Sequence, residues 1–137
     1  MKKVSILFLS ALALSLGSCG SDDNGNDTGT DASIVGKWTY SKVGSGNLLI
    51  DYPDHEEGCV KDYVELTADG VFNDVDYDSF NAPCEVFTDT GTYIKTGNTL
   101  TVSYEGTQVD TADILLLTNT ELKIQGSDGE IVLFTRQ

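Results

Sequence analysis

Short β-rich runs recur about every ten to twelve residues from Ile34 to the end of the chain, with turn-forming residues between them. Asp69-Gly70 and Asp128-Gly129 are typical of tight hairpin turns, because glycine adopts a positive φ without strain. No apolar period of about 3.6 residues, which would indicate a helix, runs through this part of the chain. The pattern therefore predicts an all-β fold. The expected strands are Ile34–Val43, Val60–Thr67, Val71–Tyr77, Glu85–Lys95, Asn98–Glu105, Thr107–Thr118, Glu121–Gln125 and Glu130–Arg136.

Side chains alternate along these runs as they do in a strand with one buried face. Leu100 and Val102, for example, alternate with the polar Thr101 and Ser103. Consecutive antiparallel strands with short connections would leave two exposed edges if the sheet stayed open. We therefore expect an antiparallel, eight-stranded meander that closes into a small β-barrel.

The first expected strand carries Gly36-Lys37-Trp38, which is similar to the G-x-W opening of lipocalins. With the later runs TADGVF, GTY and GNTLTV and the terminal FTRQ, it resembles the lipocalin-like domain of Bacteroidetes-type bacterial lipoproteins over residues 34–137. The resemblance implies a lipocalin-like barrel. In lipocalins an arginine near the end of the last strand covers the opening tryptophan, so we expect Arg136 to contact Trp38 and help close the barrel. Such a contact contributes roughly 0.5–2 kcal/mol.

Residues 1–18 have the features of a lipoprotein signal peptide. A basic start, MKK, precedes the apolar run Val4–Leu16, which is too short to cross a bilayer as a helix. The following LGSC, which ends at Cys19, resembles the bacterial lipobox. The resemblance implies that cleavage leaves Cys19 as an acylated N-terminus. The chain has three cysteines, so one of them must lack an internal partner.

Residues 19–33 are expected to form an acylated N-terminus followed by a flexible acidic tether. After Cys19 the segment contains no large apolar side chain, so it cannot bury enough surface to offset its ordering entropy. Asp22-Asp23 resembles the acidic export signal of Bacteroidetes-type surface lipoproteins. We therefore expect a lipid-anchored outer-membrane protein on the cell surface. The alternative is a spacer on a lipoprotein that faces the periplasm.

The chain is strongly acidic, with 22 Asp and Glu residues against 8 Lys and Arg residues and a formal net charge of −14. Such a surface repels phosphate backbones, so we expect no nucleic-acid partner. It also repels anionic headgroups, which leaves the lipid on Cys19 as the contact with the membrane. The domain is expected to be a monomer.

Cys59 and Cys84 are expected to form the single disulfide. An exported protein folds in an oxidising compartment, where paired cysteines are usually bridged. A hairpin turn at Asp69-Gly70 would bring Cys59 to the end of the hairpin where the chain approaches Cys84. The bridge requires a Cα separation below about 7 Å.

One acidic segment has a spacing that resembles a metal site. Asp74, Asp76, Asp78 and Glu85 have the spacing of positions 1, 3, 5 and 12 of a calcium loop, but position 6 is Ser79, where the loop needs glycine. No helices are expected beside them, so an acidic exposed face is the favoured interpretation and calcium the weaker one. No metal or other cofactor is predicted.

The segment Asp54-His55-Glu56-Glu57 contains groups that act as ligands or bases in other proteins. The chain has no second histidine, and no motif supplies a nucleophile beside this one. We therefore predict a solvated loop here and a protein without enzymatic activity.

The segment Gly44–Gly58 is the longest expected connection, and its apolar centre includes Leu48, Ile50 and Tyr52. Long ordered loops in compact domains are usually functional. We expect it to fold over one open end of the barrel as a lid, with Leu48 and Ile50 facing inward.

Two functions from different classes are compatible with these features. In the first, the barrel binds a small apolar or amphiphilic ligand in a pocket too small for a retinoid, lined by the lid residues together with Phe72 and Tyr93. In the second, the barrel core is solid and the domain has a structural or interaction role. The interior volume discriminates between them.

Overall fold

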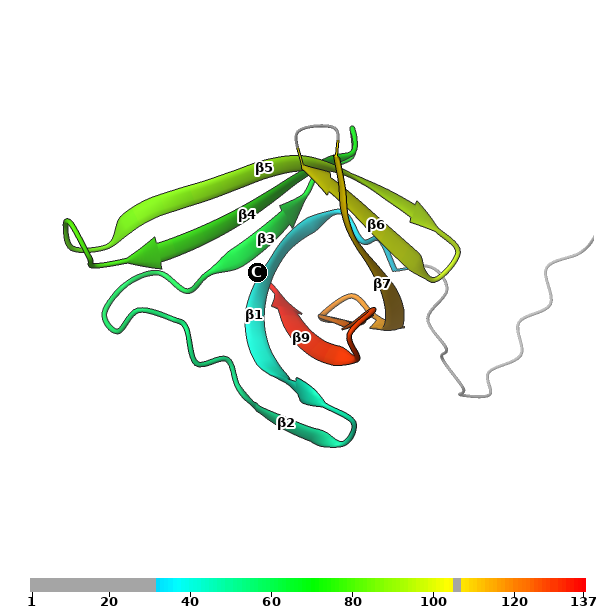
Figure 1. Cartoon of the computed structure of the whole chain (residues 1–137), viewed down its shortest axis with the longest axis horizontal. Helices are drawn as coiled ribbons and strands as arrows, with labels where there is room; N and C mark the ends of the chain where they lie inside the picture. Colours follow the sequence, from blue (N-terminus) through cyan, green and yellow to red (C-terminus); the bar gives the residue numbers. More distant parts are fainter. Residues whose placement is uncertain (1–31, 105–106) are drawn as a thin grey trace, which may run out of the picture.

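The computed structural model describes residues 32–104 and 107–137, which form one antiparallel sheet (Figure 1). The expected signal peptide, Cys19 and nearly all of the expected tether lie outside the described residues. In the described part, no helix is long and apolar enough to cross a membrane. The strands are β1 (Gly36–Ser45), β2 (Leu48–Asp51), β3 (Tyr63–Leu66), β4 (Val71–Asp78), β5 (Glu85–Thr96), β6 (Thr99–Tyr104), β7 (Thr107–Leu117), β8 (Glu121–Gly126) and β9 (Glu130–Arg136).

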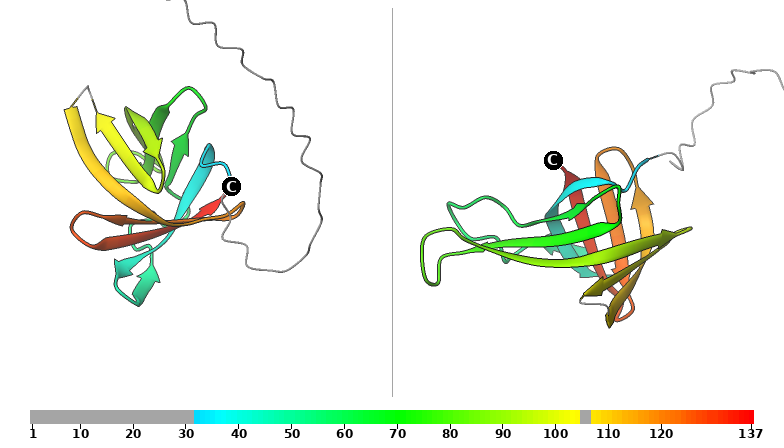
Figure 2. Two further views of the ribbon diagram at one scale, coloured as in Figure 1. Left: turned by 90° about the vertical axis from the view of Figure 1, so that its right-hand side faces the viewer. Right: turned by 90° about the horizontal axis from the view of Figure 1, so that it is seen from above.

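Eight of these strands form a closed barrel, as the sequence predicted. β1 pairs with β3, each later strand pairs with the next, and β9 returns to pair with β1. The closing ladder runs from Trp38 opposite Arg136 to Ser45 opposite Glu130. Figure 2 shows the strands curving around a common axis. Register shifts in the β1–β9, β6–β7 and β7–β8 ladders, with the extra residues on β1 and β7, supply part of this curvature, because a bulge increases local bending and twist.

The ninth strand, β2, was not expected. It forms a hairpin with the second half of β1, in which Ser45 lies opposite Leu48 and Lys42 lies opposite Asp51. The first half of β1 pairs with β3 instead. β2 and β3 therefore lie one after the other along the same edge of β1, and the chain between them leaves the sheet and returns (Figure 1).

The prediction that Leu48 and Ile50 turn inward as a lid is wrong. Leu48 is 74% exposed and Ile50 is 55% exposed. The physical reason is the pairing of β2 with β1, because the ladder extends the sheet outward and strand alternation places both side chains on a face that nothing covers. In the loop expected from the sequence, side-chain direction would not be fixed in this way.

The buried apolar core is centred on Trp38, which is fully buried. The indole Nε1 donates a hydrogen bond to the carbonyl oxygen of Ile34, 2.7 Å away, so the buried polar atom is satisfied. Leu66 and Leu122 are the other large side chains with almost no exposed surface. The rest of the cluster is made of Ile34, Val64, Phe72, Leu100, Ile114 and Phe134.

Arg136 covers Trp38, as expected from the family resemblance. The guanidinium carbon lies 4.0 Å from the centre of the indole ring. Nε donates to the carbonyl oxygen of Asn119 and Nη1 to that of Val35, each at 2.8 Å, and Nη2 donates to Ser33. One side chain thereby joins the segment before β1 to the turn before β8, which supports closure at this end of the barrel.

Cys59 and Cys84 form a disulfide, which confirms the predicted pairing. Their Cα atoms are 5.4 Å apart. Cys59 lies in the connection between β2 and β3, and Cys84 immediately precedes β5. The bridge therefore attaches the connection to the β4–β5 hairpin, which projects beyond the barrel (Figure 1).

Replacement of Arg136 should weaken closure of the barrel. Arg136→Ala removes the ring contact and the hydrogen bonds to three carbonyl groups, so the free energy of unfolding should fall by about 2–4 kcal/mol. Arg136→Lys should recover only part of this, because an ammonium lacks the planar fork of the guanidinium. Chemical denaturation measures both values. Lys61→Ala, at an exposed lysine, is the control, and an equal loss in that variant would contradict the assignment.

Candidate ligand cavity

The barrel encloses a cavity of about 300 Å³ that is partly open to solvent. This volume lies at the lower end of the range of about 300–1,000 Å³ for small-molecule sites. The predicted small, mostly apolar pocket is therefore present. Its lining consists of Tyr40, Val64, Leu66, Phe72, Asp74, Leu100, Val102, Tyr104, Asp110, Ala112, Leu122, Ile124, Val132 and Phe134.

Strand alternation explains why these side chains share the interior. On β6, Leu100, Val102 and Tyr104 all line the cavity, because every second residue of a strand points to the same face. β8 and β9 contribute pairs of residues in the same way. The cavity walls are thus built on strands of a closed sheet. Neither β2 nor the part of β1 that pairs with it contributes to the lining.

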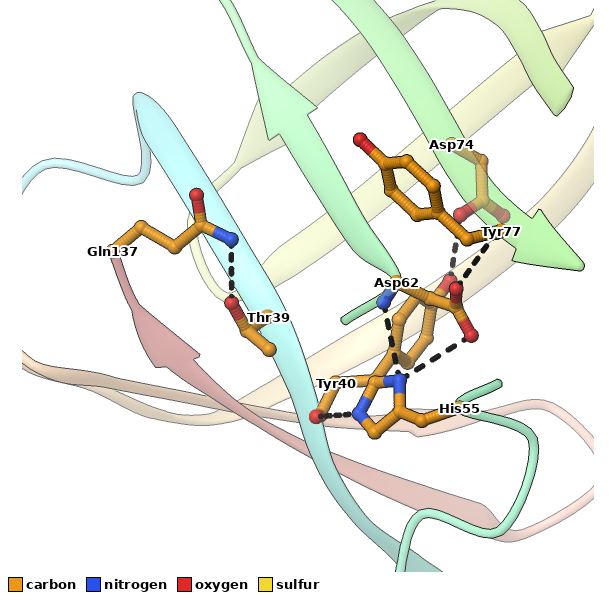
Figure 3. Close-up of polar contacts among 7 residues, drawn as sticks. All are labelled: Thr39, Tyr40, His55, Asp62, Asp74, Tyr77 and Gln137. Carbon is orange, nitrogen blue, oxygen red and sulfur yellow. Dashed lines mark hydrogen bonds and ion pairs between the residues drawn. The ribbon is translucent and has the colours of Figure 1, made fainter. Parts of the chain in front are cut away.

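Tyr40 is the central aromatic residue of the cavity wall. Its ring stacks on Tyr52 with 4.6 Å between centroids and lies against Phe134 at 4.8 Å. The phenol hydroxyl donates a hydrogen bond of 3.0 Å to Oδ1 of Asp74 (Figure 3). A second aromatic pair, Phe72 and Tyr104, meets edge to face at 5.6 Å. The Asp74 carboxylate is therefore held in position among the apolar walls by the hydroxyl of Tyr40.

Burial raises the pKa of Asp74 to about 6, and the nearby carboxylates of Asp76, Asp89 and Asp62 add to the increase. The hydrogen bond from Tyr40 acts in the opposite direction, since it favours the carboxylate. Burial also raises the pKa of Tyr40, so this phenol keeps its proton at neutral pH. Burial likewise raises the pKa of Tyr104 to about 12.

A buried polar network fixes the connection that precedes β3. Asp62 is only 2% exposed, and its Oδ1 accepts the amide hydrogen of Tyr77 at 2.9 Å. The amide of Asp62 donates to Nδ1 of His55, whose Nε2 donates to the carbonyl oxygen of Tyr40 at 2.8 Å (Figure 3). The Asp62 carboxylate lies beside the same Nδ1, at 3.3 Å.

The interpretation of Asp54-His55-Glu56-Glu57 as a solvated loop therefore needs correction at His55. The imidazole is largely covered and bridges β1 to the residue before β3. Asp54 and Glu57 are exposed, as expected. The role of His55 cannot be read from the four-residue segment, because its partners, Asp62 and the carbonyl group of Tyr40, lie outside it and only the fold brings them together.

The residues predicted to bind a ligand have different locations. Phe72 lines the cavity. Tyr93 packs against the core cluster, and its hydroxyl donates to the carbonyl oxygen of Thr67 at 2.7 Å. The ring of Tyr52 stacks on Tyr40, and Tyr52 is not part of the lining. Leu48 and Ile50 are exposed on β2. Of the predicted set, only Phe72 is part of the lining.

The four acidic residues with calcium-loop spacing do not converge. Asp74 lines the cavity, while Oδ1 of Asp78 accepts the amide hydrogen of Phe80 in the turn after β4. Glu85 pairs with Asp78 across the β4–β5 ladder. Within residues 32–104 and 107–137, no group of three or more His, Cys, Asp or Glu side chains is placed to hold a metal ion.

The Asp62 network should stabilise the fold. Asp62→Ala leaves the part-buried amide of Tyr77 without its acceptor, so the free energy of unfolding should fall by about 1–3 kcal/mol. Hydrogen exchange at the Tyr77 amide should accelerate. Chemical denaturation and exchange mass spectrometry measure the two effects. Asp113→Ala, at an exposed aspartate, is the control, and unchanged exchange at Tyr77 in Asp62→Ala would refute the network.

Two solved structures share this architecture. A lipocalin-like protein from Bacteroides uniformis matches with a TM-score of 0.59 and 12% identity, covering 76% of this chain and 98% of that one. An uncharacterized protein from Bacteroides eggerthii also matches with a TM-score of 0.59, at 10% identity, covering 77% and 100% of the two chains. At these identities the likeness shows the fold alone.

The family comparison agrees with the architecture. No curated protein matches the chain significantly. The model of the lipocalin-like domain matches residues 34–124, which is more than half of the chain. The chain therefore belongs to the family of lipocalin-like domains.

Proposed function

We propose that this domain binds a small apolar or amphiphilic molecule inside the barrel and has no enzymatic activity. The cavity of about 300 Å³ carries this proposal, because its walls are mostly aliphatic and aromatic side chains and its polar groups are few. Ligand sites typically combine these two features. Water in such a cavity makes few hydrogen bonds, so an apolar ligand that displaces it gains free energy.

The alternative, a domain whose solid core serves only as a scaffold for surface contacts, has one observation in its favour. Several large apolar side chains are exposed outside the barrel, including Phe80 at 90% and Leu48 at 74%. Phe80 lies in the β4–β5 turn and Leu48 at the β1–β2 end, and other exposed apolar side chains, such as Ile94 of β5 and Leu115 of β7, lie elsewhere. The cavity favours ligand binding over this alternative, since a solid core would leave no such volume.

We further propose that the domain is held at the outer membrane by a lipid on Cys19 and faces the cell exterior. The support comes from the sequence, where the lipobox-like LGSC follows an apolar run and precedes the acidic segment with Asp22-Asp23. Several acyl chains give a stable anchor, whereas one chain alone binds membranes only marginally.

Filling the cavity should abolish binding. Ala112 lines it, so Ala112→Phe places a ring in the space that a ligand would occupy. Uptake of the neutral fluorescent probe N-phenyl-1-naphthylamine should weaken at least about tenfold, which corresponds to about 1.4 kcal/mol. Leu115→Phe adds the same ring at an exposed position of the same strand and should bind the probe as the original chain does. If the original chain never binds the probe, the result contradicts the proposal of ligand binding.

Lipidation should depend on Cys19 alone. Metabolic labelling with an alkyne fatty acid should mark the original chain and leave Cys19→Ser unlabelled, because the thiol is the acylated group. The Cys59→Ser, Cys84→Ser double variant is the control and should keep its label. Label that persists in Cys19→Ser would sink the anchor proposal. Protease treatment of intact cells tests the surface location, and protection of the domain would place it in the periplasm.

A further inference from the structure

Asp74 is an ionisable side chain in the wall of a mostly apolar cavity. It lies two residues after Phe72 on β4, so alternation points both side chains to the interior. A carboxylate in such a place reduces stability unless it is compensated, because burial separates it from water. The raised pKa of Asp74 reflects this cost.

The protein compensates this carboxylate only in part. Oδ1 of Asp74 accepts the hydrogen bond from Tyr40 (Figure 3). Within the described part of the chain, Oδ2 accepts no hydrogen bond. No lysine or arginine of the described residues forms an ion pair with Asp74. Lys42 forms one with Asp51, but that pair is exposed on the β1–β2 hairpin. Oδ2 is not among the buried atoms that lack a partner, so it is accessible to a group that enters the cavity, and a cation there would compensate the charge.

Aromatic rings surround the same part of the cavity. Tyr40 contacts Asp74 directly, and Phe134 lies against Tyr40. Phe72 and Tyr104 form the edge-to-face pair in the same lining. The faces of such rings attract cations, and the attraction increases when the cation is removed from water.

We propose that the ligand of this cavity is a cationic amphiphile, an alkylamine or alkylammonium whose charged head pairs with Asp74 and whose apolar body fills the space between β6, β8 and β9. This inference rests on the proposed function, since it requires that the cavity takes up a ligand. The carboxylate supplies the charge complement and the aromatic rings supply weakly polar contacts for the head. The net charge of −14 also favours the approach of cations over anions.

Binding should depend on pH in one direction. With a pKa of about 6, Asp74 is mostly ionised at pH 7 and protonated at pH 5, so affinity for a cation should fall as the pH drops through 6. A bound cation would also lower this pKa, since an opposite charge favours the carboxylate. The ionisable groups that face Asp74 from the packed elements are Tyr40 of β1, Asp62 before β3, Asp76 of β4, Asp89 of β5, and the cavity-lining Tyr104 of β6 and Asp110 of β7.

The test uses three probes of equal chain length that differ only in head-group charge, namely octylammonium, 1-octanol and octanoate. Isothermal titration calorimetry with the purified full chain should give an affinity at pH 7 at least about tenfold higher for octylammonium than for octanol, with octanoate weakest. At pH 5 the advantage of octylammonium should shrink, while the affinity for octanol should stay constant.

Asp74→Asn is the diagnostic variant, because it removes the charge and keeps the shape and the acceptor for Tyr40. It should bind octylammonium and octanol alike and lose the pH dependence. Asp113→Asn, at an exposed aspartate of β7, changes the net charge equally and should keep the preference. Circular dichroism confirms that each variant is folded.

The outcomes separate the two proposals. Octanol and octylammonium binding with equal affinity in the original chain overturns the cationic ligand and leaves ligand binding intact. A preference that survives in Asp74→Asn, or disappears in Asp113→Asn, also overturns it, since net charge would then be the cause. Failure of all three probes to bind at pH 7 overturns both proposals.

Discussion

Closure of the sheet by the pairing of β1 with β9 is the constraint on which the rest of the structure depends. At one end of this ladder Arg136 covers Trp38, whose side chain has no exposed surface and is not part of the cavity lining. Two residues further along β1, Tyr40 lines the cavity. The same strand thus contributes both to the buried core and to the cavity wall. Without the closing ladder both would be more exposed to solvent.

The strands were predictable because local chemistry determines them. Asp69-Gly70 turns the chain between β3 and β4, and Gly70 has the positive φ, 86°, that glycine was expected to supply. Barrel closure followed from the need to avoid open edges. β2 was missed because its four residues lie between glycines, and only pairing with β1 makes them a strand.

The candidate site was much less predictable. Both faces of β4 mix apolar and acidic or polar side chains. Phe72 and Asp74 share one face, and Asn73 and Val75 share the other. The pattern therefore does not say which face is interior, and Asp74 was assigned to an exposed acidic face. Its position is set by long-range pairing of β4 with β3 and β5, which the sequence does not reveal.

Because β2 and β3 share one edge of β1, the structure indicates where this domain can accept inserted residues. Two short strands in tandem complete one edge of β1, and the backbone bonds from Tyr52 to Ser41 and from Tyr40 to Asp62 continue the ladders up to the break. The residues between Tyr52 and Asp62 thus form an excursion in a neighbour strand that is already discontinuous, and the hydrogen bonds of His55 and the Cys59–Cys84 disulfide attach it at two points. Extra residues or a grafted peptide placed between these attachments, at the exposed Glu57-Gly58, would lengthen an excursion that the barrel already accommodates. The same addition at any of the tight hairpins would have to break a turn.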